Sequence, residues 1–570
     1  LIGMMLIGAI GSAFAMTGQQ ILQKSELTGG LVVYIGDGDP TLTTSLTNGK
    51  SFLVHSISQN WEKVTATREA VYSKDLAGIV TADRVTATQS IPFSENAINI
   101  LVVDQDALGS LAPTEEEMQR VTAPFGMIAI KKKGSWTTKK ISMKPGMDEW
   151  THIDYGPGRT TYSKDELVGP ATSLQWISHY DKSTSGKHTL ISDGVMVYSR
   201  GGKAQARLLD RYQNKWIFAR DAFSGTMLWM KQVWLTDRGT AMILADGKLF
   251  TVVKEGEPYV AFDAKTGKEL MRYTEAGPVP PTGGKVIYHT MSTAYHNNYL
   301  YISNRTKLFK LNATTGEKVW EYKHNITGHN MYRLTLDVKH GKVFVATSTE
   351  EAGASQKFKD HGTAGLSGGQ EILSIDAKSG KLSWRQPANS LINKLAYHPN
   401  HGLITLCHLL PGDGNFRAYT DDGKTIINHG VDRFESPFFF PLPGGKTGRA
   451  GKLARSLMLS DNAIEMSFAQ SRLGGYKIEN DQLVGLHGAE HGMSGRCGHP
   501  NATPNYVFNG NNGIVLTRDG YGLNVTAMMQ NCANRLFTAY GFTFGGEGSC
   551  NCYPNSPGFR AMATRDLGAK

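Results

Sequence analysis

From residue 29 onward, the chain alternates short apolar runs with helix-like stretches. The runs at 31–35, 51–55 and 97–104 are rich in β-branched residues and predict buried strands, while the stretches at 41–46 and 60–74 predict helices. Strands that alternate with helices form a parallel sheet. The pattern therefore predicts an α/β, Rossmann-like domain over residues 16–145.

A glycine turn, Gly36-Asp37-Gly38-Asp39, follows the first of these strands. In a Rossmann-type sheet such a turn brings backbone N–H groups close to a cofactor. We therefore take Gly36, Asp37, Gly38 and Asp39 as candidate cofactor-binding residues.

After Trp150 the sequence pattern changes to short apolar runs separated by Gly, Asp and Asn, and one short motif recurs. It has Asp or Asn at its first position, Gly four residues later and a bulky apolar residue eight residues later. The copies are Asp221, Gly225 and Trp229; Asp263, Gly267 and Met271; Asn312, Gly316 and Trp320; and Asp376, Gly380 and Trp384, with a frayed copy at 420–424. Intervals of 42, 49 and 64 residues predict an all-β propeller of seven or eight blades over residues 146–570.

The repeated residues have the chemistry of a tight hairpin. Asp or Asn closes an Asx turn with the backbone, Gly adopts a positive φ, and the Trp packs between blades. These positions therefore predict scaffold rather than catalysis.

Composition supports folded domains rich in strands. Hydrophobic residues make up 40% of the chain, which excludes disorder, and 64 glycines in 570 residues suit many tight turns. The 60 basic and 50 acidic residues show no long run of one sign, so nucleic-acid binding is not expected.

The first fifteen residues are uncharged and end in Ala13-Phe14-Ala15, an A-x-A pattern typical of a signal-peptide cleavage site. They are too few to span a bilayer, which takes about 20 residues. A short buried strand or a clipped anchor are the alternatives. We expect an exported protein, periplasmic or extracellular, with no transmembrane segment. Cys497, Cys532, Cys550 and Cys552 are then disulfide candidates, leaving Cys407 unpaired.

The N-terminal region resembles the class I S-adenosylmethionine-dependent methyltransferases. The resemblance rests on the turn at 35–39, the run at 91–96 before the strand at 98–103, and the passage at 115–126, which is similar to the family's helix followed by "RVLxPGG", altered at Thr122 and Phe125. The family has an acidic residue for the ribose hydroxyls after the second strand, and residues 54–58 contain none. The domain is therefore either an inactive relic or one that still binds a ligand similar to S-adenosylmethionine.

The repeat resembles the tryptophan-docking motif of quinoprotein alcohol dehydrogenases and of related propellers without cofactor. In the quinone enzymes, adjacent cysteines cover pyrroloquinoline quinone, acidic and amide side chains hold calcium, and an Asp is catalytic. No Cys-Cys pair occurs here, and no calcium set can be assigned. The two regions together resemble large propeller proteins of environmental bacteria such as planctomycetes.

Two clusters carry candidate chemistry. His487, His491, Cys497 and His499 are potential zinc or copper ligands, although the glycines among them also suit an inter-blade loop. Residues 148–152, Asp-Glu-Trp-Thr-His, suit either acid–base chemistry or a linker that docks its Trp against the propeller.

These observations favour a binding or scaffold module that uses the propeller face for a protein or small ligand. The alternatives are a quinone-dependent oxidoreductase and an active methyltransferase. No catalytic residue is identified.

Overall fold

The computed structural model divides the chain into two compact units, one of residues 1–144 with 221–228 and the other of residues 145–220 with 229–570. The residues whose structure is described are 16–178, 189–200, 215–233, 242–254, 256–278, 292–325, 329–350, 366–387, 392–407, 415–430, 439–442, 446–449, 454–468, 471–493, 500–509, 514–518, 522–525, 535–546 and 558–565.

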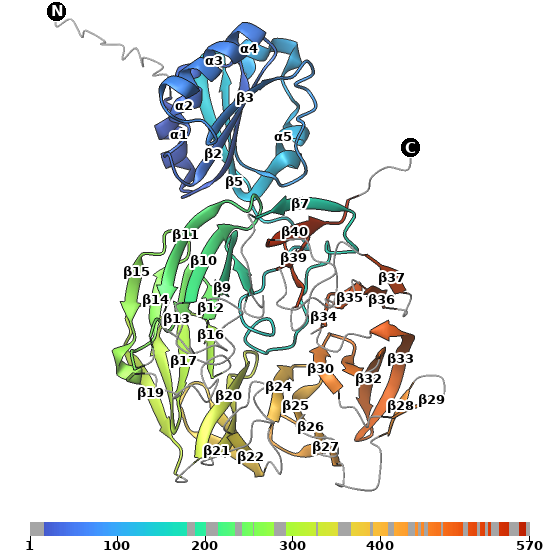
Figure 1. Ribbon diagram of the computed structural model, residues 1–570. Coiled ribbons are helices and arrows are strands. Elements are labelled where there is room, and N and C mark those ends of the chain that lie inside the picture. The colour runs from blue at the N-terminus through green and yellow to red at the C-terminus, as the bar shows by residue number, and fades with distance from the viewer. Residues whose placement is uncertain are drawn as a thin grey trace, which may run out of the picture. The chain divides into compact units, whose positions relative to one another are not determined.

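The N-terminal unit contains a six-stranded sheet in the order β3-β2-β1-β4-β5-β6 (Figure 1). Five strands are parallel and β6 is antiparallel. The strands are β1 (Gly30–Gly36), β2 (Phe52–Ser58), β3 (Val80–Arg84), β4 (Ile98–Asp104), β5 (Thr122–Lys132) and β6 (Ser135–Lys140). The helices are α1 (Gly18–Ser25), α2 (Pro40–Ser45), α3 (Trp61–Ser73), α4 (Gln105–Leu108) and α5 (Glu115–Val121), with a 3₁₀ turn at Gly109–Leu111. The Rossmann-like prediction is confirmed.

This sheet is buried on both faces, as continuous apolar strands require. Val32 and Tyr34 of β1 pack in one cluster with α1 and α3, while Val33 and Ile35 pack in another with α5. Polar side chains begin the helices: Thr17 forms a capping box with Gln20, and Asn60 accepts from the amides that open α3.

One residue that departs from the methyltransferase motif has an unusual backbone conformation. Phe125, which replaces a glycine of the "RVLxPGG" passage, has φ +64°. A bulky residue seldom adopts this left-handed region, whereas glycine does so without steric cost. Phe125 therefore holds a backbone conformation that glycine would adopt more easily at this position.

The C-terminal unit is a propeller of eight four-stranded sheets, so the higher of the two predicted blade numbers is correct (Figure 1). Blades 1 to 4 are β8–β11 (Thr189–Ser192, Val195–Arg200, Lys215–Asp221, Met227–Val233), β12–β15 (Met242–Ala245, Lys248–Thr251, Val260–Asp263, Glu269–Arg272), β16–β19 (Thr293–His296, Tyr299–Asn304, Lys307–Asn312, Lys318–Lys323) and β20–β23 (His329–Asp337, Lys342–Glu350, Leu366–Asp376, Leu382–Pro387).

Blades 5 to 8 complete the circle. They are β24–β27 (Ile392–His398, Gly402–Cys407, Asn415–Tyr419, Thr425–Gly430), β30–β33 (Ala454–Leu459, Ile464–Phe468, Ser471–Glu479, Gln482–Met493), β34–β37 (Asn501–Ala502, Tyr506–Asn509, Ile514–Thr517, Gly522–Asn524) and β38–β40 (Phe537–Ala539, Phe542–Gly545, Arg560–Ala563) with β7 (Ser173–Ile177). A two-stranded ribbon, β28–β29 (Phe439–Leu442, Lys446–Arg449), lies between blades 5 and 6 in the sequence.

Blade 8 joins the two ends of the propeller sequence. Its outer strand β7 precedes blade 1 in the chain and pairs antiparallel with β40, near the C-terminus. The circle is therefore closed by backbone hydrogen bonds. No helix in the described parts of the chain is both long and apolar enough to cross a membrane.

The repeated residues form the turn between the third and fourth strands of blades 1 to 4. In each, the carboxylate or amide oxygen of the first residue accepts backbone N–H bonds from the turn, and the N–H of the Gly, whose φ lies between 68° and 77°, donates to that residue's carbonyl. This is the Asx-turn and positive-φ chemistry of a tight hairpin.

Each Trp of the repeat docks on the turn of the next blade. The indole N–H of Trp320 donates to the carbonyl of Ala377 at 3.0 Å, and its ring lies against Gly380, where a Cβ would come within 2.7 Å. Trp229 and Trp384 make the equivalent contacts with Gly267 and Gly423. Trp320 is 9% exposed, while Trp229 and Trp384 are only half-buried. These indole rings therefore contact the adjacent blade near the surface of the propeller and are not fully buried between blades.

Candidate functional site

The segment from Asp148 to Ser163 forms a ring inside the propeller, which we call the axial ring. Its backbone or side chains bond to the first strand of each blade in turn, or to the residue just after that strand. In chain order from 148, the partners are Tyr540 (blade 8), Ile191 (blade 1), Leu244 (blade 2), Tyr295 (blade 3), Leu336 (blade 4), Tyr397 (blade 5), Leu459 (blade 6) and Ala502 (blade 7).

The axial ring closes on itself beside blade 8. The Asp165 carboxylate accepts from the backbone N–H groups of Asp148, at 3.1 Å, and Gly541, at 2.9 Å. Burial raises the pKa of this carboxyl to about 6, although the amide donors oppose the shift. A sixteen-residue segment thus makes one full circuit of the blades.

The residues at 148–152 serve this structure. Trp150 is fully buried and meets Phe537 of β38 edge to face at 5.5 Å. Glu149 accepts hydrogen bonds from Ser192, Asp193 and Tyr540, and the pKa of its carboxyl is raised by burial. Of the two interpretations of residues 148–152, the linker that docks its Trp against the propeller fits the structure. The side chains that could have served acid–base chemistry form hydrogen bonds with the propeller.

A buried ion cluster lies on the axial ring. Asp154 forms ion pairs with Lys394 of β24, at 2.7 Å, and with Arg535, at 2.6 Å. Burial alone would raise the pKa of the Asp154 carboxyl, but the two cations outweigh it and hold that pKa well below its ordinary value. These ion pairs link the axial ring to blade 5 through Lys394 and to blade 8 through Arg535.

His152 and Arg159 add two further buried polar side chains to the axial ring. Arg159 donates three hydrogen bonds to the carbonyls of Ile153, Thr293 and Leu334, and burial lowers its pKa to about 10. Nε2 of His152 accepts from the backbone N–H of Tyr295 at 3.0 Å. Burial and the nearby Arg159 hold the pKa of His152 well below 6.5, so the imidazole of His152 is neutral.

The axial ring is also conformationally strained. Four of its non-glycine residues, Asp154, Tyr155, Arg159 and Thr161, have φ between 54° and 65°. Left-handed residues of this kind persist where the surrounding structure over-determines them, and they cluster at functional sites. The surrounding blades supply that constraint here.

The glycine turn of the N-terminal unit lies where the sequence places it, at the carboxyl end of β1. The Asp37 carboxylate accepts from the hydroxyl of Tyr34, at 2.6 Å, and from the backbone N–H of Asp39, at 3.1 Å. Asp39 itself caps α2 by accepting from the N–H of Thr41. Both carboxylates are therefore engaged within the turn.

No acidic residue ends β2, whose last residues are Ser56, Ile57 and Ser58. The carboxylates at the ends of the two nearby strands are paired: Asp83 of β3 with Arg68, and Asp104 of β4 with Lys131 at 2.8 Å. Each of the four carboxylates described at this edge of the sheet, Asp37, Asp39, Asp83 and Asp104, therefore already has a partner in the chain.

The metal candidates of the sequence are only partly located. His487 and His491 lie in strand β33, so the expected inter-blade loop is wrong for these two positions, because β33 continues through the glycines and pairs with β32. Their side chains, with Cys497 and His499, lie outside the described residues, as do the disulfide candidates Cys532, Cys550 and Cys552 and the side chain of Cys407.

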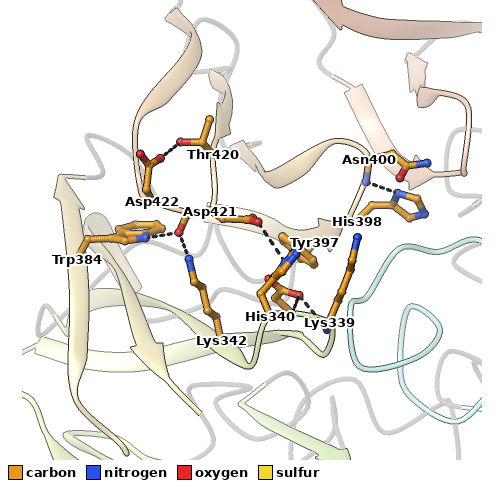
Figure 2. A network of polar contacts seen from close by, with 11 residues as sticks. Lys339, His340, Lys342, Trp384, Tyr397, His398, Asn400, Thr420, Asp421 and Asp422 are labelled. Carbon is orange, nitrogen blue, oxygen red and sulfur yellow. Dashed lines mark hydrogen bonds and ion pairs between the residues drawn. The ribbon is translucent and has the colours of Figure 1, made fainter. Parts of the chain in front are cut away.

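A polar cluster absent from the sequence predictions joins blades 4 and 5. Figure 2 shows His340, Tyr397 and Asp421 pointing toward one another. Nδ1 of His340 lies 2.9 Å from Asp337, 3.2 Å from Asp421 and 3.2 Å from the hydroxyl of Tyr397. Beside them, His398 pairs with Asp461 at 3.3 Å, and burial and the neighbouring His401 lower the pKa of His398 to about 4.

Sequence comparison supports the propeller repeat. Residues 166–355 match a PQQ-like family model described as Outer membrane protein assembly factor BamB. This part of the propeller carries a PQQ-like repeat. The family match covers 190 of the 570 residues, and no curated protein matches this chain.

Similar solved structures include both propellers and methyltransferases. Quinohemoprotein alcohol dehydrogenase from Comamonas testosteroni is 15% identical, with 74% of this chain and 82% of that chain covered and a TM-score of 0.46. BamB from Moraxella catarrhalis is 13% identical, with 63% and 95% covered and a TM-score of 0.38. A SAM-dependent methyltransferase from Aquifex aeolicus is 21% identical, with 20% and 62% covered and a TM-score of 0.16.

Proposed function

We propose that this protein is an exported, non-catalytic binding module whose propeller binds another protein. The observation that carries the proposal is the axial ring, which joins all eight blades with hydrogen bonds from a single segment. Catalytic propellers need polar groups free to meet a substrate. On this axis, Asp154, Arg159 and His152 are instead bound to the chain's own scaffold.

The described residues on the axis do not fit a bound quinone. Residues 148–163 run around the axis along the inner strands, and a ligand in their place would have to displace hydrogen bonds to the blades. Each buried polar group left without a partner would cost about 1–3 kcal/mol. The sequence also has no adjacent cysteine pair.

A protein partner is favoured by the family description, which names an assembly factor of outer membrane proteins. The propeller closed on its axis offers the rims of its blades as rigid surface. Export is supported by the apolar run that ends in Ala13-Phe14-Ala15. In this proposal the N-terminal domain has kept its fold and lost cofactor binding.

Titration with pyrroloquinoline quinone and Ca²⁺ tests the non-catalytic part of the proposal. Isothermal calorimetry and absorbance should detect no saturable binding by the full-length protein, and no alcohol-dependent dye reduction should follow. An apo quinoprotein alcohol dehydrogenase is the positive control. Micromolar quinone binding with dye reduction would show that the axis is a cofactor site and would overturn the proposal.

A further inference from the structure

The cluster between blades 4 and 5 brings together metal-ligating groups from separate parts of the chain. Asp337 ends β20 and His340 lies in the turn that follows it, whereas Asp421 lies in the turn between β26 and β27. One ligand atom from each of these three residues lies within 4.8 Å of the other two. The cluster therefore spans the junction of two blades.

Hydrogen bonding alone leaves this cluster poorly matched. Two carboxylate oxygens lie 2.9 and 3.2 Å from the same imidazole nitrogen, Nδ1 of His340. A single N–H points at one acceptor at a time, and here two carboxylate oxygens meet at one nitrogen. A divalent cation would satisfy all three groups at once.

The repeat itself marks Asp421 as unusual. Ala222, Ala264, Ala313 and Ala377 follow the first residue of the four regular turns, and Asp421 occupies this position in the frayed fifth copy. Its backbone keeps the scaffold role, because its carbonyl accepts from the indole of Trp384 as Ala377 accepts from Trp320. The Asp421 carboxylate is therefore not needed for the docking of Trp384, since the other turns that accept a Trp have an Ala at this position.

Burial and local charge suit a cation site open on one side. The Asp337 side chain is fully buried, and its other oxygen is held by the backbone N–H groups of Lys339 and His340. His340 and Asp421 remain 40% and 38% exposed, which leaves a path for a metal ion. The ammonium of Lys342 is bound to the Asp421 carbonyl and does not neutralise the pair of carboxylates by a direct contact.

We propose that Asp337, His340 and Asp421 form a zinc site. Zinc bonds of about 2.0–2.1 Å in tetrahedral geometry put neighbouring ligand atoms roughly 3.3 Å apart, close to the separations seen here. Imidazole nitrogen with carboxylate oxygen is a donor set that zinc accepts, whereas calcium and magnesium prefer oxygen alone.

Tyr397 acts as an outer partner of the site. Its hydroxyl lies 3.2 Å from Nδ1 of His340, where it can orient the ligating groups from outside the metal's own ligand set. The bound ion would link blade 4 to blade 5 beside the Trp384 docking contact. The site would therefore be structural, adding a metal link to the hydrogen bonds and apolar packing that already join the two blades.

The test is zinc stoichiometry in the full-length protein and in two variants that differ by one position. Asp421→Asn removes a ligand, whereas Asp422→Asn changes the adjacent carboxylate, which accepts a hydrogen bond from the Thr420 hydroxyl. Zinc should bind the wild type and Asp422→Asn equally, and Asp421→Asn should bind one equivalent fewer or bind that equivalent at least about tenfold more weakly. Counting the difference excludes zinc held elsewhere on the chain.

Cobalt substitution checks the site without relying on a variant. Co²⁺ added to metal-free wild-type protein should give the visible absorption of a four-coordinate N/O site, and zinc should displace it. Equal zinc content in both variants, or a wild type that binds no zinc at micromolar concentration, would overturn the proposal. Circular dichroism of Asp421→Asn distinguishes loss of a ligand from loss of the fold.

Discussion

At the scale of single residues, the docking Trp side chains join each blade to the turn of the next. Trp320→Ala should lower the free energy of unfolding by about 3 kcal/mol, the low end for a large aromatic, since the ring is slightly exposed and loses its bond to Ala377. Thermal melting measures the loss. Lys381→Ala changes an exposed residue of the neighbouring docking turn and should have little effect. Equal, negligible shifts in both variants would contradict the docking role.

His152 makes the stability of the propeller depend on pH. Its pKa is depressed in the folded state, so its contribution is complete above the unfolded value of about 6.5 and is lost as pH falls below it. At pH 5.5 this single group should cost about 1.4 kcal/mol. His152→Gln, which keeps an acceptor for Tyr295 and does not titrate, should show a correspondingly smaller fall in its urea midpoint between pH 7.5 and 5.5. An identical pH dependence in both proteins would contradict a neutral, buried His152.

Local chemistry explains which residues could be predicted from sequence. Asp263, Gly267 and their counterparts recur at fixed spacing because an Asx turn and a positive φ are properties of five adjacent residues. His152 and Asp154 gave no such signal, because their roles depend on partners such as Lys394, 240 residues away from Asp154. For the proposed zinc site, the signal in the sequence was Asp421, which stands where the four regular turns have Ala.

At the scale of elements, the axial ring is the segment most sensitive to added volume. A Cβ on Gly158 would lie 2.7 Å from the carbonyl oxygen of Tyr397, whereas a Cβ on Gly156 would meet nothing within 4 Å. Gly158→Ala should therefore destabilise the propeller by more than Gly156→Ala. The latter should cost only about 1 kcal/mol for its left-handed backbone, φ +49°. Chemical unfolding measures both, and a smaller effect at Gly158 would show that the ring is loosely held.

The turn between β1 and α2 should no longer bind S-adenosylmethionine tightly. The carboxylate expected after β2 is absent, and each charge-assisted hydrogen bond lost to a ribose hydroxyl is worth about 1.5–3 kcal/mol. Calorimetric titration should therefore find millimolar affinity or none. Low-micromolar binding would mean that Asp37 or Asp39 leaves its contacts in the turn to take the place of the missing acid.

Elements were predictable where one periodicity dominated. The three strands and two helices expected in the α/β unit, which correspond to β1, β2, β4, α2 and α3, lie within a few residues of the expected bounds. Strand β33 was missed because Gly485, Gly488 and Gly492 read as a loop, whereas pairing with β32 holds those glycines in a sheet. Here tertiary pairing overrides the local preference of glycine.

At the scale of the whole molecule, the propeller repeat was predictable and the closure of its axis was not. Four regular turns are enough to indicate blades, but copies after residue 424 lack the motif, which left the blade number open. The axial ring has no repeat at all, because it passes each of the eight blades only once along its sixteen residues. A segment that reads as a linker in sequence thus becomes the part of the chain that contacts every blade.

Native mass spectrometry of the full-length protein purified from its source tests the central claim, that the propeller is a protein-binding module with a closed axis. The account predicts the mass of the polypeptide with metal ions at most, together with a complex of fixed stoichiometry with a second protein. A retained organic cofactor of the mass of a quinone or a nucleotide, released on denaturation, would contradict it.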